Sequence, residues 1–293
     1  MKLSVETLRI RDYFDDKTAV RMIKEAGFDA YDYSACVSKG EKYMLGDDYL
    51  TRAHELREYA DALGIPCNQA HAPFEGVFLD AGDLNENNPY FLAKVRSIEF
   101  ASILGARTIV IHAQKPPSED IDLIEANRRF YLSLLPYAER FGIDISVENL
   151  FYGSSPSGRA LPLFGDPKLH RSFIESLGSD RFNACLDVGH TYLTGFDPAD
   201  SVRVLGKDHL KCLHVHDNLG MKDLHMIPYT AGIDWSAFTD AIADSGYAGD
   251  LTLELVGCVG RMPKDLCADI LRFSAAVGRY LISEIERKTG KNV

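Results

Sequence analysis

A set of His, Asp and Glu side chains recurs at the ends of apolar, strand-like runs in this 293-residue sequence. Imidazole and carboxylate groups together are the ligands that suit Zn²⁺, Mn²⁺ and related divalent ions. A carboxylate that follows a buried run must be paired, hydrogen-bonded or bound to a metal. The set therefore predicts a metal site. It comprises His71, His112, Glu148, Asp187, His190, His214, His216, Asp223, His225 and Glu254.

Each of these residues alone has a simpler interpretation. A single His at a strand end is usually a hydrogen-bonded structural residue, Glu148 or Glu254 could pair with an Arg, and Asp187 could cap a loop. Their coincidence favours a site, because six of the nine His residues fall in this one set. The other three lie in helical or flanking stretches, and we expect them at the surface. They are His54, His170 and His209.

The elements that must position these side chains alternate between β-prone and helical patterns. Strands are predicted near 3–8, 30–35, 67–72, 108–113, 144–150, 182–188, 210–216 and 250–256. Helices are predicted near 17–26, 48–63, 89–104, 121–140, 167–176, 198–205, 235–244 and 264–286. Four glycines follow successive helical runs, where a left-handed C-cap favours Gly. They are Gly27, Gly64, Gly105 and Gly142.

Eight β-then-α units indicate parallel strands joined by helical crossovers, and eight is the number that closes a TIM barrel. We therefore predict an α/β fold, a single (β/α)₈ barrel domain over residues 1–293, with the active site at the C-terminal ends of the strands. An open doubly wound sheet is the alternative, but the sequence has no GxGxxG or Walker A motif. The longest irregular stretch, 152–165, is expected to be a lid or binding loop.

Composition narrows the classes of partner. With 32 Lys and Arg against 43 Asp and Glu, the net charge is −11, which argues against nucleic-acid binding. No run of about 18 apolar residues predicts a membrane span, and the N-terminus does not resemble a secretory signal. Six Cys residues without a CxxC pair are interpreted as reduced core cysteines. We expect a cytoplasmic protein with no membrane partner.

Several motifs resemble one known superfamily. The segments SVENL, CLDVGH, LHVHDN, KDLH, AGIDW and TLEL are similar to those of the xylose isomerase-like TIM barrels. That superfamily includes sugar isomerases and epimerases, inosose dehydratases and the apurinic endonuclease IV group. The resemblance implies a four-ligand metal site formed by Glu148, Asp187, His214 and Glu254.

The resemblance to endonuclease IV implies more ligands, because that enzyme binds three zinc ions. The positions of its remaining ligands match His71, His112, His190, Asp223 and His225. Two features depart from the nuclease pattern: His216 in HVHDN, and the acidic AHAPFEGVFLD segment, which has no basic residue to meet a phosphate backbone. His214 and His216 point to the same side of a strand. We favour His214 as the ligand and His216 as its support or a substrate contact.

The function that the resemblance implies is isomerisation or epimerisation of a sugar, sugar phosphate or cyclitol. The metal, zinc or manganese with magnesium or cobalt as alternatives, would stabilise an enediolate while Glu148 and Glu254 move the proton. His190, His216 and Arg159 are candidate substrate contacts, although Arg159 could equally lie in a solvated loop.

Three other functions stay open. They are a multi-zinc phosphodiesterase acting on abasic DNA, a dehydratase or lyase acting on a keto-sugar or inosose, and a non-catalytic sugar-binding barrel. Substrate specificity is expected in loops 73–89 and 152–165. A homo-oligomer is compatible with the sequence.

Overall fold

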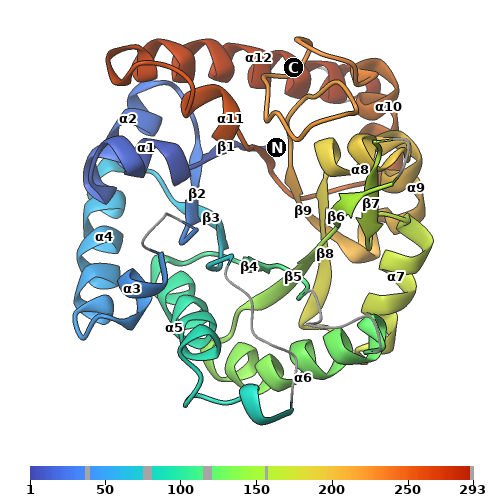
Figure 1. Ribbon diagram of the computed structural model, residues 1–293. Coiled ribbons are helices and arrows are strands. Elements are labelled where there is room, and N and C mark those ends of the chain that lie inside the picture. The colour runs from blue at the N-terminus through green and yellow to red at the C-terminus, as the bar shows by residue number, and fades with distance from the viewer. Residues whose placement is uncertain (37–39, 75–80, 115–120, 156–157, 291–293) are drawn as a thin grey trace.

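Eight parallel strands form the centre of the protein, in the order β10-β1-β2-β3-β4-β5-β8-β9. The computed structural model describes residues 1–36, 40–74, 81–114, 121–155 and 158–290. A parallel bridge between Val215 and Leu253 joins the two ends of the sheet and closes the barrel (Figure 1). The strands are β1 (Leu3–Glu6), β2 (Ala30–Ser34), β3 (Cys67–His71), β4 (Thr108–Ile111), β5 (Asp144–Glu148), β8 (Phe182–Asp187), β9 (Leu210–His214) and β10 (Leu251–Leu253).

Helices surround these strands and complete the α/β barrel that the sequence predicts (Figure 1). The eight predicted helices are present, with ends shifted by a few residues. They are α2 (Asp16–Glu25), α4 (Tyr49–Leu63), α5 (Pro89–Leu104), α6 (Leu123–Phe141), α7 (Pro167–Ser176), α9 (Pro198–His209), α10 (Trp235–Ser245) and α12 (Cys267–Lys288). Gly64, Gly105 and Gly142 end α4, α5 and α6 with φ values of 64°, 83° and 67°, which confirms those caps.

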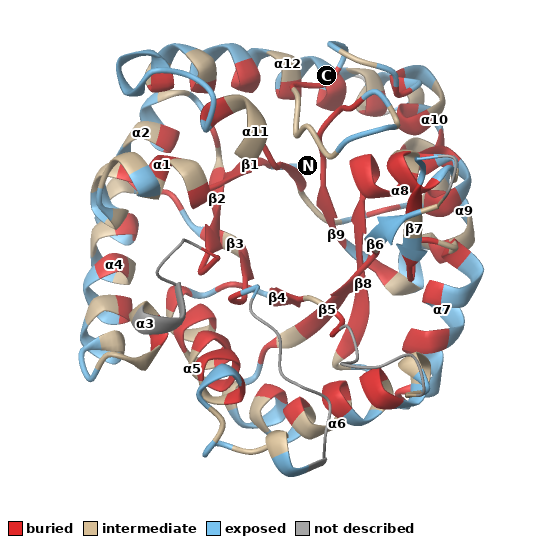
Figure 2. Cartoon of the chain, viewed as in Figure 1, coloured by how far each residue is buried: buried red, intermediate tan, exposed pale blue. Residues whose placement is uncertain are grey.

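Four short α-helices in the described part of the chain were not predicted from the sequence: α1 (Leu8–Tyr13), α3 (Gly40–Leu45), α8 (Val188–Thr194) and α11 (Val256–Val259). Helices of four to seven residues are too short to show a repeating apolar face. Three of them begin where a strand was predicted to end, so those strands are shorter than predicted. Figure 2 shows the barrel strands buried, which explains their nearly continuous apolar runs.

Two structural predictions made from the sequence were wrong. The stretch 152–165 is not irregular, because β6 (Leu150–Ser154) pairs antiparallel with β7 (Ala160–Leu163). Gly153 and Pro162 interrupt the pattern that would have indicated these strands; residues 156–157 lie outside the described part. His170 is buried rather than exposed, and its Nε2 lies 2.9 Å from the carbonyl oxygen of Val147.

The six Cys residues are free thiols, and all are buried except the half-buried Cys258. This confirms the interpretation as core cysteines. Among the described residues, no helix combines the length and apolar character needed to cross a membrane.

Candidate functional site

Four buried side chains meet at the C-terminal end of the barrel. Glu148 ends β5, Asp187 ends β8, His214 ends β9, and Glu254 follows β10. One potential ligand atom from each lies within 4.8 Å of the others. Parallel strands bring their ends to one face of the barrel, so residues more than 100 positions apart in the sequence become neighbours. This is the set that the resemblance implied as a metal site.

Two further groups adjoin this one. His190, His216, Asp223 and His225 form a second group with ligand atoms within 4.8 Å, and His71 joins Glu148 and His214 in a third. Because Glu148 and His214 belong to two groups, the first and third are continuous. All ten residues that the sequence analysis selected at strand ends therefore lie in or beside one cluster.

Glu148 is the centre of the cluster. One carboxylate oxygen lies 2.8 Å from Nε2 of His112 and 3.3 Å from Nε2 of His71. The other lies 3.0 Å from Nδ1 of His214 and 3.6 Å from Nδ1 of His190. A carboxylate with four imidazole neighbours can either accept protons from them or share a cation with them.

Asp187 joins the first group to the second. Its side chain caps α8 by accepting a hydrogen bond of 2.6 Å from the backbone N–H of His190. It also lies 3.1 Å from Nε2 of His216. Asp223 in turn lies 2.8 Å from Nε2 of His225 and 3.4 Å from Nε2 of His190. His214 and His216 each offer a possible ligand atom, and they belong to different groups.

Four polar atoms of the cluster are buried without a hydrogen-bond partner in the described part of the chain. They are Nε2 of His214, Nδ1 of His216, Oδ1 of Asp223 and Oε2 of Glu254. A buried polar atom left unpartnered costs about 1–3 kcal/mol. Imidazole nitrogens and carboxylate oxygens that share this deficit are a donor set that a divalent cation would satisfy. The residues present therefore fit the metal that the resemblance implies.

The charges of the cluster shift the pKa values of its carboxyl groups in different directions. Burial raises the pKa of Glu148, but His214 and His112 outweigh it and hold that pKa well below its usual value. Asp187 is similar: against burial, His190 and His216 lower its pKa to about 2. Burial keeps the pKa of Glu254 raised, although His214 and His225 oppose it. A bound cation would lower all three values further.

The same contacts raise the pKa values of three histidines of the cluster, which are His190, His214 and His225. Burial lowers the pKa of His225, but Glu254 and Asp223 outweigh it and raise the pKa to about 9. Neighbouring carboxylates likewise raise the pKa values of His190 and His214 well above their usual range. The pKa of His112 shifts the other way, because burial lowers it to about 4.

Metal affinity is therefore expected to rise steeply with pH. A metal binds neutral imidazole, so protons compete with it up to the raised pKa values, to about pH 9 at His225, rather than only to about 6.5. Mn²⁺ affinity measured against a competing chelator between pH 6 and 9 should increase at least tenfold, with proton release detected by calorimetry. A His209→Gln variant, changed outside the cluster, should follow the same curve. Affinity that is constant above pH 7 would contradict this.

Two buried acids on the first two strands were not predicted from the sequence. Glu6 ends β1 and is 3% exposed; burial, together with the charge of Glu254, raises its pKa to about 8. Asp32 lies in β2, where it accepts a hydrogen bond of 2.9 Å from Nε2 of Gln69 and lies 3.6 Å from Nε2 of His214. These strands have only four and five residues, and each also contains a serine, so the sequence contained no signal to distinguish these acids from solvent-exposed ones.

Asp217 was also missed, and it supports the segment that carries Asp223 and His225. Its buried carboxylate accepts five hydrogen bonds of 2.9–3.1 Å across the chain. The donors are the backbone N–H groups of Asn218, Ala231, Gly232 and Ile233 and the indole Nε1 of Trp235.

The Asp217→Ala variant is expected to lower the free energy of unfolding by about 3 kcal/mol or more, because several buried donors lose their acceptor at once. Urea denaturation measures this loss. Asp217→Asn keeps one carbonyl oxygen and should lose less. A change below about 1 kcal/mol in Asp217→Ala would show that the carboxylate does not organise this segment.

Two connected cavities open above the cluster. One, of about 390 Å³, is lined by His112, Glu148, His190 and the hairpin residues Leu150, Phe151, Tyr152 and Leu163. The other, of about 540 Å³, is lined by Arg9, Val256, Gly257, Gly260 and Arg261. Both include Phe74, Asp223, His225 and Glu254, so they are continuous at the cluster.

The predicted specificity loops contribute unequally to these cavities. The β6–β7 hairpin, which overlaps the predicted loop 152–165, forms an apolar wall, and the ring of Phe74 lies 4.8 Å from the ring of His112. Arg159 is exposed, and its guanidinium lies against Gly195 rather than among the residues that line either cavity. Residues 75–80 of the other loop lie outside the described part of the chain.

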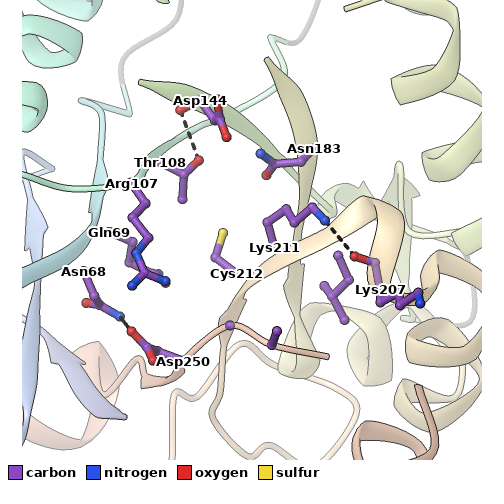
Figure 3. A pocket seen from close by; sticks show the side chains of 13 residues that line it. Asn68, Gln69, Arg107, Thr108, Asp144, Asn183, Lys207, Lys211, Cys212 and Asp250 are labelled. Atoms are coloured by element: carbon purple, nitrogen blue, oxygen red, sulfur yellow. Dashed lines mark hydrogen bonds between the residues drawn. The ribbon is translucent and has the colours of Figure 1, made fainter. Parts of the chain in front are cut away.

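A third cavity, of about 210 Å³, lies at the opposite, N-terminal end of the barrel strands. Figure 3 shows Arg107 extending toward Asn68 and Gln69, with Lys211 bonded to the carbonyl oxygen of Lys207 at 2.7 Å. Asn68 donates to Asp250, and Thr108 to the carbonyl oxygen of Asp144. Because these polar groups bond to one another, and because this end of a TIM barrel serves stability, we assign no catalytic role to this cavity.

The comparisons with known proteins agree with this architecture. The profile described as "Xylose isomerase-like TIM barrel" matches residues 20–273, so the chain belongs to the xylose isomerase-like TIM barrel family. An uncharacterized protein of Sinorhizobium fredii, y4fM, is 27% identical over 261 residues, covering 80% of this chain and 78% of its own length.

Two solved structures share the fold over nearly the whole chain. A D-tagatose 3-epimerase-like protein aligns with a TM-score of 0.74 at 20% identity, covering 99% of both chains. The IolI protein, solved with a bound zinc atom, aligns with a TM-score of 0.74 at 15% identity, covering 98% of this chain and 99% of its own. At sequence identities of 15–20%, similarity to these structures establishes the fold alone. The evidence for the chemistry is the cluster of His, Asp and Glu side chains.

Proposed function

We propose that the protein is a divalent-metal-dependent isomerase or epimerase of a sugar, sugar phosphate or cyclitol. The observation that carries the proposal is the group of Glu148, Asp187, His214 and Glu254, whose ligand atoms lie within 4.8 Å of one another beside a cavity of about 390 Å³. The fold shared with a D-tagatose 3-epimerase-like protein supports the substrate class. Zinc in the related IolI structure supports zinc as one candidate metal.

The chemistry divides between the metal and the protein. Glu148, Asp187, His214 and Glu254 would hold a divalent ion, which would supply the positive charge that stabilises an enediolate form of the substrate. Glu148 and Glu254 come from different strands of the barrel, and one would remove the proton from carbon while the other returns it. Proton transfer of this kind needs a carboxylate within hydrogen-bond reach of the carbon-bound hydrogen. The histidines around Glu148 hold its orientation.

Three narrower statements belong to the same proposal. Residues 1–293 form one domain, the metal is zinc or manganese in preference to magnesium or cobalt, and the protein acts in the cytoplasm. The second group, His190, His216, Asp223 and His225, leaves room for a second ion, and three of its members are among the nine positions that resemble endonuclease IV.

This second group favours one other candidate function, a multi-zinc phosphodiesterase acting on abasic DNA. The net charge of −11 argues against it, because a DNA-binding enzyme must neutralise several phosphates. Loss of water or cleavage of a carbon bond from the same enediolate is a third outcome, which product analysis would detect.

Metal analysis followed by a substrate screen tests the proposal. The purified protein should hold at least one divalent ion per chain, and chelation should abolish conversion of ketoses, aldoses or inososes. An abasic-site oligonucleotide serves as the control substrate. Sugar conversion that survives complete metal removal would contradict the proposed role of the cluster.

A further inference from the structure

The two cavities above the cluster differ in chemical character. The first has an apolar wall formed by the β6–β7 hairpin, with Leu163 and Phe151 facing the cluster cavity. The second is bordered by two arginines, Arg9 of α1 and Arg261, which follows α11. A substrate bound at the cluster therefore has one apolar side and one cationic side. Such asymmetry indicates a substrate whose two ends differ in charge.

Arg261 is a cation without a carboxylate partner among the residues that the structure describes. Arg9 lies 2.7 Å from Asp12, but this pair is at the surface, with 42% of the Arg9 side chain exposed. Exposed ion pairs contribute little and exchange readily. Both guanidinium groups are therefore available to an anion that enters the cavity of about 540 Å³.

The backbone fixes Arg261 relative to the cluster. The N–H of Cys258 donates a hydrogen bond of 3.2 Å to the carbonyl oxygen of His225. Gly257 packs closely on Leu224, because a Cβ atom added at Gly257 would lie 1.9 Å from the carbonyl oxygen of Leu224. The hydroxyl of Tyr13 donates to the carbonyl oxygen of Met262 at 2.9 Å. Arg261 is thus held on a segment anchored on both sides, at the edge of the cavity.

We infer that the substrate carries an anionic group, a phosphate ester or a carboxylate, remote from the carbon whose proton moves, and that Arg261 and Arg9 bind this group. The inference rests on the proposed function and specifies its substrate class. A guanidinium fork matches both phosphate and carboxylate in a bidentate manner. Two arginines suit one such group, whereas a DNA backbone requires neutralisation of many.

Matched compounds test this with the metal-loaded protein. Each set contains a neutral sugar such as D-fructose, its terminal phosphate ester, and a uronic acid of equal chain length, and calorimetry measures the dissociation constants. The phosphate ester or the uronic acid should bind at least tenfold more tightly than the neutral sugar. Arg261→Gln should remove most of this preference, a roughly ten- to hundredfold loss. Arg272→Gln, on an exposed Arg of α12 paired with Asp269, is the matched control and should retain the preference.

The outcomes distinguish the anionic substrate group from the proposed isomerase or epimerase function. Preference for the ester alone identifies a phosphate, and preference for the acid alone identifies a carboxylate. The anion inference is overturned if no charged compound binds more tightly than its neutral counterpart. It is also overturned if Arg261→Gln weakens binding of the charged compound and of the neutral sugar equally. Solvent-hydrogen exchange into a neutral sugar would then still support the proposed function. Charge preference without exchange into any compound would instead count against the isomerase.

Discussion

Glu148→Gln and Glu254→Gln are each expected to lower kcat on the true sugar substrate by about 10²–10⁴-fold, because general acid–base catalysis typically contributes that factor. Gln retains the size of Glu and one oxygen ligand but cannot accept a proton. The loss should therefore persist when metal is supplied in excess. Steady-state kinetics with saturating Mn²⁺ or Zn²⁺, accompanied by metal analysis of each variant, measures the effect.

Two controls distinguish proton transfer from metal binding in this experiment. Glu125→Gln changes an exposed glutamate in the first turn of α6 and should leave kcat unaltered. Glu148→Gln and Glu254→Gln should also fail to exchange the carbon-bound hydrogen of the substrate with solvent, whereas Glu125→Gln should exchange it. A Glu148→Gln enzyme that recovers full activity once its metal content is restored would show that Glu148 only binds the ion.

Asp187→Ala is expected to weaken metal binding by well over a hundredfold. Even residues that merely orient a ligand alter affinity by about 10–100-fold, and Asp187 is itself proposed as a ligand. The side chain also caps α8 and lies 3.1 Å from His216. The metal content per chain after dialysis against a weak chelator measures the loss.

Asp187→Asn separates the two roles of this side chain. Asn can still accept the hydrogen bond from the N–H of His190 and keep the cap of α8, because Asn and Asp are equally good N-caps. It lacks the negative charge that favours a cation. We therefore expect normal thermal stability of the metal-free Asn variant with weakened metal binding. Undiminished metal in both variants would remove Asp187 from the site.

The sequence was most informative where a long apolar run ends in one polar side chain. Asp187 and Glu148 could be predicted because buried strand residues precede them, five before Asp187 and three before Glu148, and the strand ends there. The barrel itself was predictable because eight such runs alternate with helices long enough to show an amphipathic face. The predicted proximity of these residues follows from the topology alone.

The remaining features depend on contacts that no local pattern expresses. Glu6 ends a strand of only four residues, and its burial results from packing near Glu254 rather than from its own neighbours in the sequence. Arg261 lines a cavity because α11, a single turn, is hydrogen-bonded to the carbonyl oxygen of His225. The hairpin β6–β7 was hidden by a Gly and a Pro within its strands.

Solvent-deuterium incorporation tests the central claim most directly. The metal-loaded protein would be incubated in deuterated water with ketoses, aldoses and inososes and their charged derivatives, and carbon-bound deuterium would be detected by NMR and mass spectrometry. We predict one deuterium at the carbon that is isomerised or epimerised, dependent on metal and absent in Glu148→Gln. Conversion of a sugar without deuterium incorporation would contradict proton transfer through the glutamates. Cleavage of an abasic-site oligonucleotide without any sugar conversion would identify the protein as a nuclease instead.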